Sequence, residues 1–287
     1  MKPWIILFVV VTGLTLLSVK VSRQSSVSAL TVESEALPVI NQNGQRVPVL
    51  VELFTSEGCS SCPPADAVLA KLERTQPVAG AEVIALGQHV DYWNYIGWAD
   101  PFSSPLFSER QGDYGRAFNR DGVYTPQMVV DGEVEFIGSN LSKAREAIAK
   151  AAMHQKATVQ ITRAAAASNA ADGPVAFKVR VADLPPLSSN ETVDLMLAVT
   201  ESELSSQVSR GENSGRTLEH GSVVRHLAII TQADPRDAKV INAEPSVKLA
   251  REWKRENLRA VAFVQAHHSR RVLGVAVVRL AGNAGAE

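Results

Sequence analysis

The only two cysteines of the 287-residue chain are Cys59 and Cys62, and two serines separate them. They directly follow the apolar run 49–54 and precede a helical pattern that begins at Pro63. A Cys-x-x-Cys pair between a strand and a helix is typical of thiol–disulfide exchange. The helix amides and the positive end of the helix dipole favour a thiolate on Cys59. We therefore expect Cys59 to attack and Cys62 to resolve the mixed disulfide.

Two other interpretations of the cysteine pair remain open. A disulfide can be a structural staple, although a bridge around two intervening residues removes little chain entropy from the unfolded state. His89, at the end of the next predicted strand, could instead join Cys59 and Cys62 as a third ligand for copper or zinc. Such a set leaves zinc one ligand short. The alternative for His89 is a histidine that is hydrogen-bonded at the end of its strand.

Neighbouring residues both favour and oppose ionisation of Cys59. The two serines offer hydroxyl donors, whereas Glu57 places a negative charge nearby, which raises a thiol pKa. We expect Cys59 to be partly exposed, with a pKa below that of a free thiol. Glu52, the only acid in the preceding strand, is a candidate proton relay for Cys62. The alternative is a glutamate that faces solvent or bonds a loop.

Strands and helices alternate around the cysteines. Apolar runs predict strands, helical spacing predicts helices, and Asp131-Gly132 predicts a two-residue hairpin turn. The first two strands are expected to be parallel, with a right-handed crossover. The ranges are 49–54 and 83–90 for these strands, 63–74 and 103–118 for helices, 127–137 for the hairpin and 140–152 for a last helix.

The composition changes after His154. Short apolar runs between loops rich in proline, serine, asparagine and glycine predict a mainly-β, sandwich-like domain, with one helix at 247–256. The expected organisation is a lead-in at 30–46, an α/β domain at 47–155, an accessory β domain at 156–282 and a tail at 283–287.

Residues 1–29 have the pattern of a targeting segment. Lys2 precedes an apolar run at 4–19, and a small-x-small cleavage site follows at 27–29. Basic residues just after the run also fit an uncleaved N-terminal anchor. We expect contact with a membrane only if this segment stays uncleaved. In both cases we expect a periplasmic or secreted protein, where disulfides persist. The net charge of −1, without a long basic block, gives no reason to expect nucleic acid as a partner.

Three features, in order, resemble thioredoxin. They are the cysteine pair after a strand, Thr125-Pro126 before a strand and a hairpin, and the final helix at 140–152. The resemblance implies an α/β, thioredoxin-like fold for residues 47–155. It also implies a cis bond at Pro126, packed against the cysteines. Such a bond presents the backbone of Thr125 to a partner chain.

The wider pattern resembles a bacterial family of uncharacterised secreted proteins that have a thioredoxin-like domain followed by a β domain. The matching stretches are 52–66, 89–93, 124–127 and 210–216. A fold alone brings no activity, so function has to be inferred from the site. We expect a thiol–disulfide oxidoreductase that acts on protein thiols, with no cofactor beyond its redox-active disulfide. Two cysteines cannot recycle themselves through a second pair, so an external redox partner is expected.

Further candidate residues flank the cysteines. Trp93 could wall a substrate groove, and Arg210 and Arg216 could fold over the first domain and bind an anionic group. The alternatives are ordinary loop packing and salt bridges. Two competing functions remain: a metal carrier that uses Cys59, Cys62 and His89, and a binding module that kept the fold without the chemistry.

Overall fold

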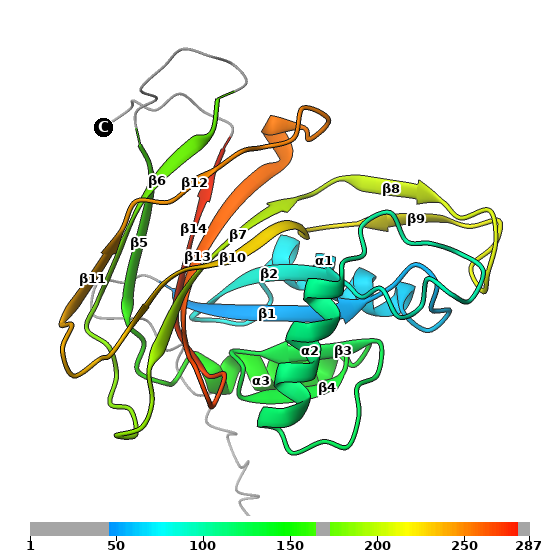
Figure 1. Ribbon diagram of the computed structural model, residues 1–287. Helices are drawn as coiled ribbons and strands as arrows, with labels where there is room; N and C mark the ends of the chain where they lie inside the picture. Colours follow the sequence, from blue (N-terminus) through cyan, green and yellow to red (C-terminus); the bar gives the residue numbers. More distant parts are fainter. Residues whose placement is uncertain (1–45, 165–172, 281–287) are drawn as a thin grey trace, which may run out of the picture. The chain divides into compact units, whose positions relative to one another are not determined.

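The computed structural model describes residues 46–164 and 173–280 (Figure 1). The predicted targeting segment, almost all of the lead-in and the tail lie outside these residues. The first half contains β1 (Val47–Thr55), α1 (Pro63–Thr75), β2 (Ala81–His89), α2 (Pro105–Ala117), β3 (Gln127–Val130), β4 (Val134–Ile137) and α3 (Leu141–Ala151). None of the described helices is long and apolar enough to cross a membrane.

The second half is almost entirely strand. It contains β5 (Thr158–Arg163), β6 (Val175–Ala182), β7 (Val193–Glu201), β8 (Leu204–Gln207), β9 (Thr217–His220), β10 (Val223–Ala233), β11 (Val240–Ala243), β12 (Ser246–Val247), the 3-10 helix η1 (Arg255–Asn257), β13 (Leu258–Ala266) and β14 (Val272–Arg279). The chain is thus a mixed α/β protein with more strand than helix.

An eight-stranded mixed sheet runs through both halves, in the order β14-β13-β7-β10-β2-β1-β3-β4. Strands β1 and β2 are parallel, as the sequence predicts, and β3 joins β1 antiparallel. Strand β10 continues the sheet beside β2, with Val223 opposite Gly87. The boundary expected near residue 155 stays a prediction, because the two parts share one sheet.

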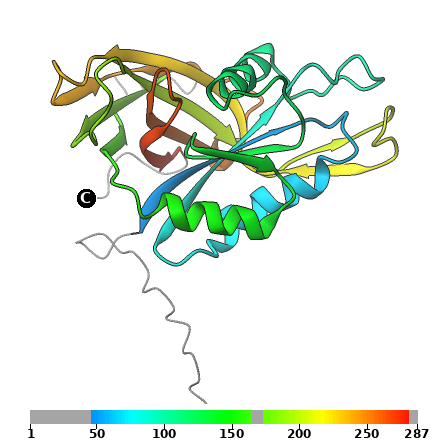
Figure 2. The ribbon, with the colours of Figure 1, turned by 90° about the horizontal axis from the view of Figure 1, so that it is seen from below.

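Helices cover both faces of the part of this sheet that the first half of the chain forms (Figure 2). Val51 and Leu53 of β1 belong to the core under α1 and α3, whereas Leu50 and Phe54 belong to the core under α2. The side chains alternate in this way because successive residues of a strand point to opposite faces. Strand β1 is therefore buried on both sides, and its carboxyl end is held in a fixed position.

A smaller sheet of β5, β6, β11 and β12 packs over the other end of the large sheet. Phe177 and Val179 of β6 and Leu195 and Leu197 of β7 belong to one buried core. The sandwich-like domain itself stays a prediction. Strands β7, β13 and β14 also contribute to this core and belong to the large sheet, which the sequence pattern did not indicate.

The predicted helix at 247–256 is wrong. Ser246 and Val247 pair with β6, and the only helical turn there is η1. Lys254 N–H donates to the Glu201 carboxylate. These tertiary hydrogen bonds use backbone groups that a helix would need, so they override the local helical propensity.

The hairpin between β3 and β4 is confirmed, although Val130 pairs with Val134, so the loop has the three residues 131–133 in place of the two predicted. Its turn residues Asp131 and Gly132 have φ angles of 48° and 67°. Asp131 also makes contacts outside the turn, because its carboxylate accepts a hydrogen bond from Leu50 N–H and lies beside Lys156. The turn also accepts a hydrogen bond from Val272 N–H, which joins it to β14. A local turn motif thus becomes a contact between the two halves.

Candidate functional site

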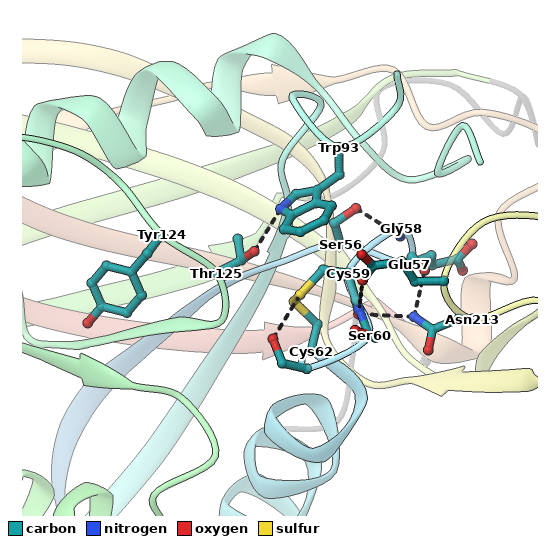
Figure 3. The surroundings of a disulfide bond; sticks show 12 residues. Ser56, Glu57, Gly58, Cys59, Ser60, Cys62, Trp93, Tyr124, Thr125 and Asn213 are labelled. Atoms are coloured by element: carbon teal, nitrogen blue, oxygen red, sulfur yellow. Dashed lines mark hydrogen bonds between the residues drawn. A yellow bond between two sulfur atoms is a disulfide. The ribbon is translucent and has the colours of Figure 1, made fainter. Parts of the chain in front are cut away.

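The cysteine loop, residues 56–62, connects the carboxyl end of β1 to the start of α1. Cys59 and Cys62 form a disulfide within it (Figure 3). Cys62 is the N-cap of α1, and its carbonyl accepts from Ala65 N–H and Asp66 N–H at 2.8 and 3.1 Å. Pro63 and Pro64 occupy the first helical positions, where a missing N–H is tolerated because those donors have no helical partner. The prolines therefore start the helix and do not disturb it.

Both cysteines are fully buried, which differs from the expected partial exposure of Cys59. Gly58 lies against Trp93, and a Cβ on Gly58 would be 3.2 Å from the Trp93 Cβ. Ser61 Oγ is 3.4 Å from Cys59 Sγ. Burial follows because side chains from two distant segments, around Trp93 and Asn213, cover the loop (Figure 3).

The loop before β3 contributes Thr125 to the site, and the cis bond that the resemblance implied is present. The Thr125-Pro126 bond is cis, and Pro126 is buried. Trp93 Nε1 donates to Thr125 Oγ1 at 2.7 Å, which ties the aromatic loop after β2 to the loop before β3. Trp93, Thr125 and the disulfide thus come from three separate segments and gather in one place (Figure 3).

The loop predicted to fold over the first half does so, but through other residues than its arginines. Asn213 is buried, and its Nδ2 donates to Glu57 O and Cys59 O at 2.8 and 3.0 Å. Glu212 Oε2 accepts from Ser60 N–H at 2.9 Å. Arg216 acts one step further away, because its Nη1 donates to Asn213 Oδ1 at 2.8 Å. Arg210 is exposed, and its predicted role in anion binding stays a prediction.

An acid–histidine cluster includes Glu57 of the cysteine loop and consists of Glu57, Asp66, His89, Asp100 and His220. His89 Nδ1 lies 2.7 Å from Asp100 Oδ2, and His220 Nε2 lies 2.9 Å from Glu57 Oε1. The two imidazole rings pack edge to face, with centroids 4.8 Å apart. Both ion pairs are buried, so each histidine is fixed by its own carboxylate.

The cluster is linked further into the loops around it. Asp100 Oδ2 also accepts from Glu57 N–H at 2.8 Å, and Trp98 Nε1 donates to Glu57 Oε2 at 2.7 Å. The Glu57 carboxylate is therefore bound by His220 and Trp98. Both of its oxygens therefore have partners within the site, and its predicted effect on the pKa of Cys59 stays a prediction.

The pKa values of the cluster move in a consistent pattern. Burial lowers the pKa of His89, but Asp100 together with the charges of Asp66 and Glu57 outweighs burial, so the net pKa of His89 is raised. Burial raises the pKa of Asp100, but His89 together with hydrogen bonds from the backbone of Glu57 and Phe102 outweighs burial, so the net pKa of Asp100 is lowered. Burial raises the pKa of Asp66, and the opposing charges of His89 and His220 offset only part of this rise. Asp66 thus holds a proton more readily than an exposed aspartate.

Cys62, the N-cap residue, precedes Asp66 of α1 by four residues, a spacing that brings two side chains to the same face of a helix. Glu52, the acid proposed from the sequence as a relay, has other partners. Arg110 Nε lies 2.7 Å from Glu52 Oε2, and Gln88 Nε2 donates to the same oxygen at 2.6 Å. Tyr114 donates to its other oxygen. The relay role of Glu52 stays a prediction, and Asp66 is a second acid that the helix geometry brings near Cys62.

The metal interpretation gains no ligand set from the structure. Within residues 46–164 and 173–280, no group of three or more histidine, cysteine or acidic side chains is arranged to hold a metal ion. His89 Nδ1 is bound to Asp100, which is also how metal-binding histidines are often oriented. A metal site of Cys59, Cys62 and His89 therefore stays a prediction for the reduced form.

A family described as a protein of unknown function, DUF1223, matches residues 50–265. This chain belongs to the DUF1223 family. The X-ray structure of an Agrobacterium tumefaciens protein, a structural genomics target, is similar at 26% identity and a TM-score of 0.59, with 85% of this chain and 98% of that chain covered. HBP35 of Porphyromonas gingivalis is similar in fold, at 12% identity and a TM-score of 0.58, with 82% and 76% covered. A comparison with curated proteins gives no match.

Sequence reasoning missed several residues of this DUF1223 site. His220 and Asn213 lie 163 and 154 residues from their partners in the cysteine loop, and no local pattern marks such contacts. Asp100 sits in an irregular loop without a periodic signal. The prediction for residues 210–216 named the two arginines and not Asn213. Asp66 could have been found, because four-residue spacing from Cys62 places it one helical turn away.

Proposed function

We propose that this protein is a thiol–disulfide oxidoreductase that acts outside the cytoplasm on cysteines of other proteins, with residues 47–155 in a thioredoxin-like fold. One observation carries the proposal: a disulfide closes a two-residue loop where a buried strand meets the start of a helix. The helix start favours a thiolate on Cys59, and the Ser61 hydroxyl, 3.4 Å from its sulfur, can donate to that thiolate. No cofactor other than the disulfide is needed.

The reaction balances with a dithiol as the electron donor. A partner thiolate attacks Cys59 Sγ, the Cys59–Cys62 bond breaks, and Cys62 leaves as a thiolate that takes up a proton. The second partner thiolate then attacks the partner sulfur of the mixed disulfide and releases Cys59, which is protonated in turn. Two electrons and two protons pass from the partner to the pair, and the reverse sequence reduces a partner disulfide.

The surroundings of the disulfide support a redox role over a staple. A bridge around two residues contributes little stability by chain entropy. Burying the ionisable groups of the acid–histidine cluster is costly unless each is paired, and such clusters gather at functional sites. A site that interconverts one disulfide and two thiols must also exchange two protons. The cluster supplies acids and bases for that purpose beside a pair that is closed to solvent.

Recycling requires a second protein or small thiol. The sequence contains no cysteine besides Cys59 and Cys62. After each exchange the pair therefore has to be restored by an external thiol or disulfide. The redox potential of the pair decides the direction: about −120 mV is typical of an oxidant and about −270 mV of a reductant.

The test uses the oxidised full chain and a reduced dithiol polypeptide. We expect the wild type to oxidise the polypeptide stoichiometrically, as measured by alkylation and mass spectrometry. In the reverse direction, with the polypeptide in its disulfide form, the lone Cys59 thiolate of Cys62→Ser should attack that disulfide, release one polypeptide thiol and stay trapped as a mixed disulfide, whereas the matched variant Cys59→Ser should trap little. A wild type that stays folded yet exchanges no disulfide over hours would show that the bridge is a staple or belongs to a binding module.

A further inference from the structure

The hairpin of β8 and β9 ends in a tip, residues 208–216, that lies on the cysteine loop. Among the described residues, these two strands form a separate two-stranded sheet with each other. The tip is closed by Val208 N–H donating to Arg216 O at 3.0 Å and by Gly215 N–H donating to Val208 O at 2.8 Å. Figure 1 shows the hairpin extending from the large sheet along the side of β1 and β2. The tip is thus a compact unit that packs against the cysteine loop.

The tip binds main-chain groups of the cysteine loop with side chains. The Asn213 amide donates to the carbonyls of Glu57 and Cys59, and the Glu212 carboxylate accepts from the N–H of Ser60. Arg216 decides which way the Asn213 amide faces, because its N–H donates to Oδ1 and so directs Nδ2 to the two carbonyls. A strip of main-chain groups beside the disulfide, the carbonyls of Glu57 and Cys59 and the N–H of Ser60, is therefore hydrogen-bonded to side chains of the hairpin tip.

Such a strip is what an extended polypeptide binds. A peptide in β conformation presents N–H and C=O groups that pair with exposed main-chain groups, as in β-strand addition. The loop beside the tip also offers apolar side chains, because Tyr95 and Ile96 are 91% and 50% exposed. Gly211 packs on this loop, where an added Cβ would be 3.3 Å from Ile96 O.

We infer that the hairpin tip occupies the binding place of an extended, cysteine-containing polypeptide, which displaces the tip and takes over the main-chain groups of Cys59 and Ser60. The substrate class is then a polypeptide segment, and a thiol without peptide groups reacts only when the tip lifts by itself. This inference rests on the proposed oxidoreductase function. Asn213, Arg216 and Glu212 are its specificity-determining residues.

The experiment compares a peptide of about ten residues with one central cysteine against 2-mercaptoethanol. Each thiol is mixed with the oxidised full chain, and formation of the mixed disulfide with release of the Cys62 thiol is followed by rapid quenching. Asn213→Ala removes both bonds to the carbonyls. We expect its rate constant with 2-mercaptoethanol to rise about tenfold, because the tip opens more often.

The peptide should respond differently, in a way that a merely structural change does not reproduce. For the peptide, Asn213→Ala should lower the half-saturating concentration about tenfold and leave the maximal rate unchanged, since the bound peptide has already displaced the tip. Arg216→Met should act in the same direction with a smaller effect. Glu219→Ala, an exposed change on β9 away from the loop, is the control and should change neither value.

A second arm tests the main-chain pairing itself. N-methylation of the peptide on either side of its cysteine should raise the half-saturating concentration several-fold, because it removes N–H donors. Unchanged kinetics in Asn213→Ala and Arg216→Met, or no effect of N-methylation, would overturn the inference while leaving exchange by the wild type intact. If wild type and variants exchange with neither thiol, the proposed function itself fails.

Discussion

At the scale of single residues, the site is defined by how buried charges are paired. Glu57 and Asp100 each hold one histidine, and Asp66 lies within reach of the charge of both. Each pairing lowers the free energy of a charge that would be costly alone in this position. The cysteine loop thus contributes Glu57 to a cluster whose protonation is coupled, because a change in one member alters the field at the others.

Asp66→Asn tests whether that cluster serves the exchange reaction. Burial raises the pKa of Asp66, so the wild-type carboxyl releases its proton at a higher pH than an exposed aspartate. We expect the variant to lose the part of the pH–rate profile that follows this titration, with a rate about tenfold lower near pH 7. Asp91→Asn is the control, because its carboxylate binds Ser108. Superimposable profiles for Asp66→Asn and wild type would exclude a role in proton transfer.

His89→Gln tests the coupling through stability. The net pKa of His89 is raised above 6.5, so its pairing contributes stability that is fully present below about pH 6.5 and is lost as the pH rises through the folded value. Asp100, whose pKa is lowered from 3.8, contributes above that pH and loses its contribution in more acidic solution. Urea unfolding from about pH 6 to 9 should show a decline in the wild type that is smaller in the variant. Parallel curves would contradict the assignment.

The residues that sequence reasoning identified are those with local signals. The spacing of Cys59 and Cys62 and the Thr125-Pro126 pair are short patterns, and the structure places the disulfide and Thr125 together with Trp93. His220 and Asn213 could not be found in this way, because their partners are determined by how β9 folds back on the first half. The false helix at 247–256 has the same origin, since pairing with β6 overrides a local preference.

At the scale of elements, a buried ion pair joins β1 to α2. Glu52 and Arg110 are both buried, and Arg110 also donates to Gln265 of β13. The pair therefore links a central strand, a covering helix and a strand of the second half. Because β1 ends in the cysteine loop, this linkage fixes the base from which the disulfide projects.

Arg110→Met should destabilise the protein by about 3–5 kcal/mol, because it leaves the Glu52 carboxylate buried without its partner. The double variant Glu52→Leu with Arg110→Met should recover much of that loss, since both charges are then absent. Denaturant unfolding of the two single variants and the double variant measures the interaction. Additive losses in the double variant would show that the two side chains act independently.

At the scale of the whole described chain, the two halves complete one another. Strand β10 lies beside β2, and Phe263 of β13 belongs to the same core as Phe54 of β1. Without the second half, β2 would become an edge strand and this core would face water. Unpaired edges and exposed apolar surface of this kind promote association.

A fragment of residues 46–155 should therefore fail to fold as a monomer, although it contains both cysteines and all three α-helices of the described chain. We expect oligomers by size-exclusion chromatography and a non-cooperative thermal transition. The full chain under the same conditions is the reference. A monomeric fragment with cooperative unfolding would support an independent domain with its boundary near residue 155.

The distance along the chain between Cys59 and Asn213, 154 residues, also sets an order of events during synthesis. Chains grow from the N-terminus at roughly 5–20 residues per second, so the cysteines precede their cover by about 8–30 s. During that interval both thiols are open to any oxidant, and afterwards the hairpin tip closes over them. Oxidation of the two thiols during that interval therefore does not require the hairpin tip to lift.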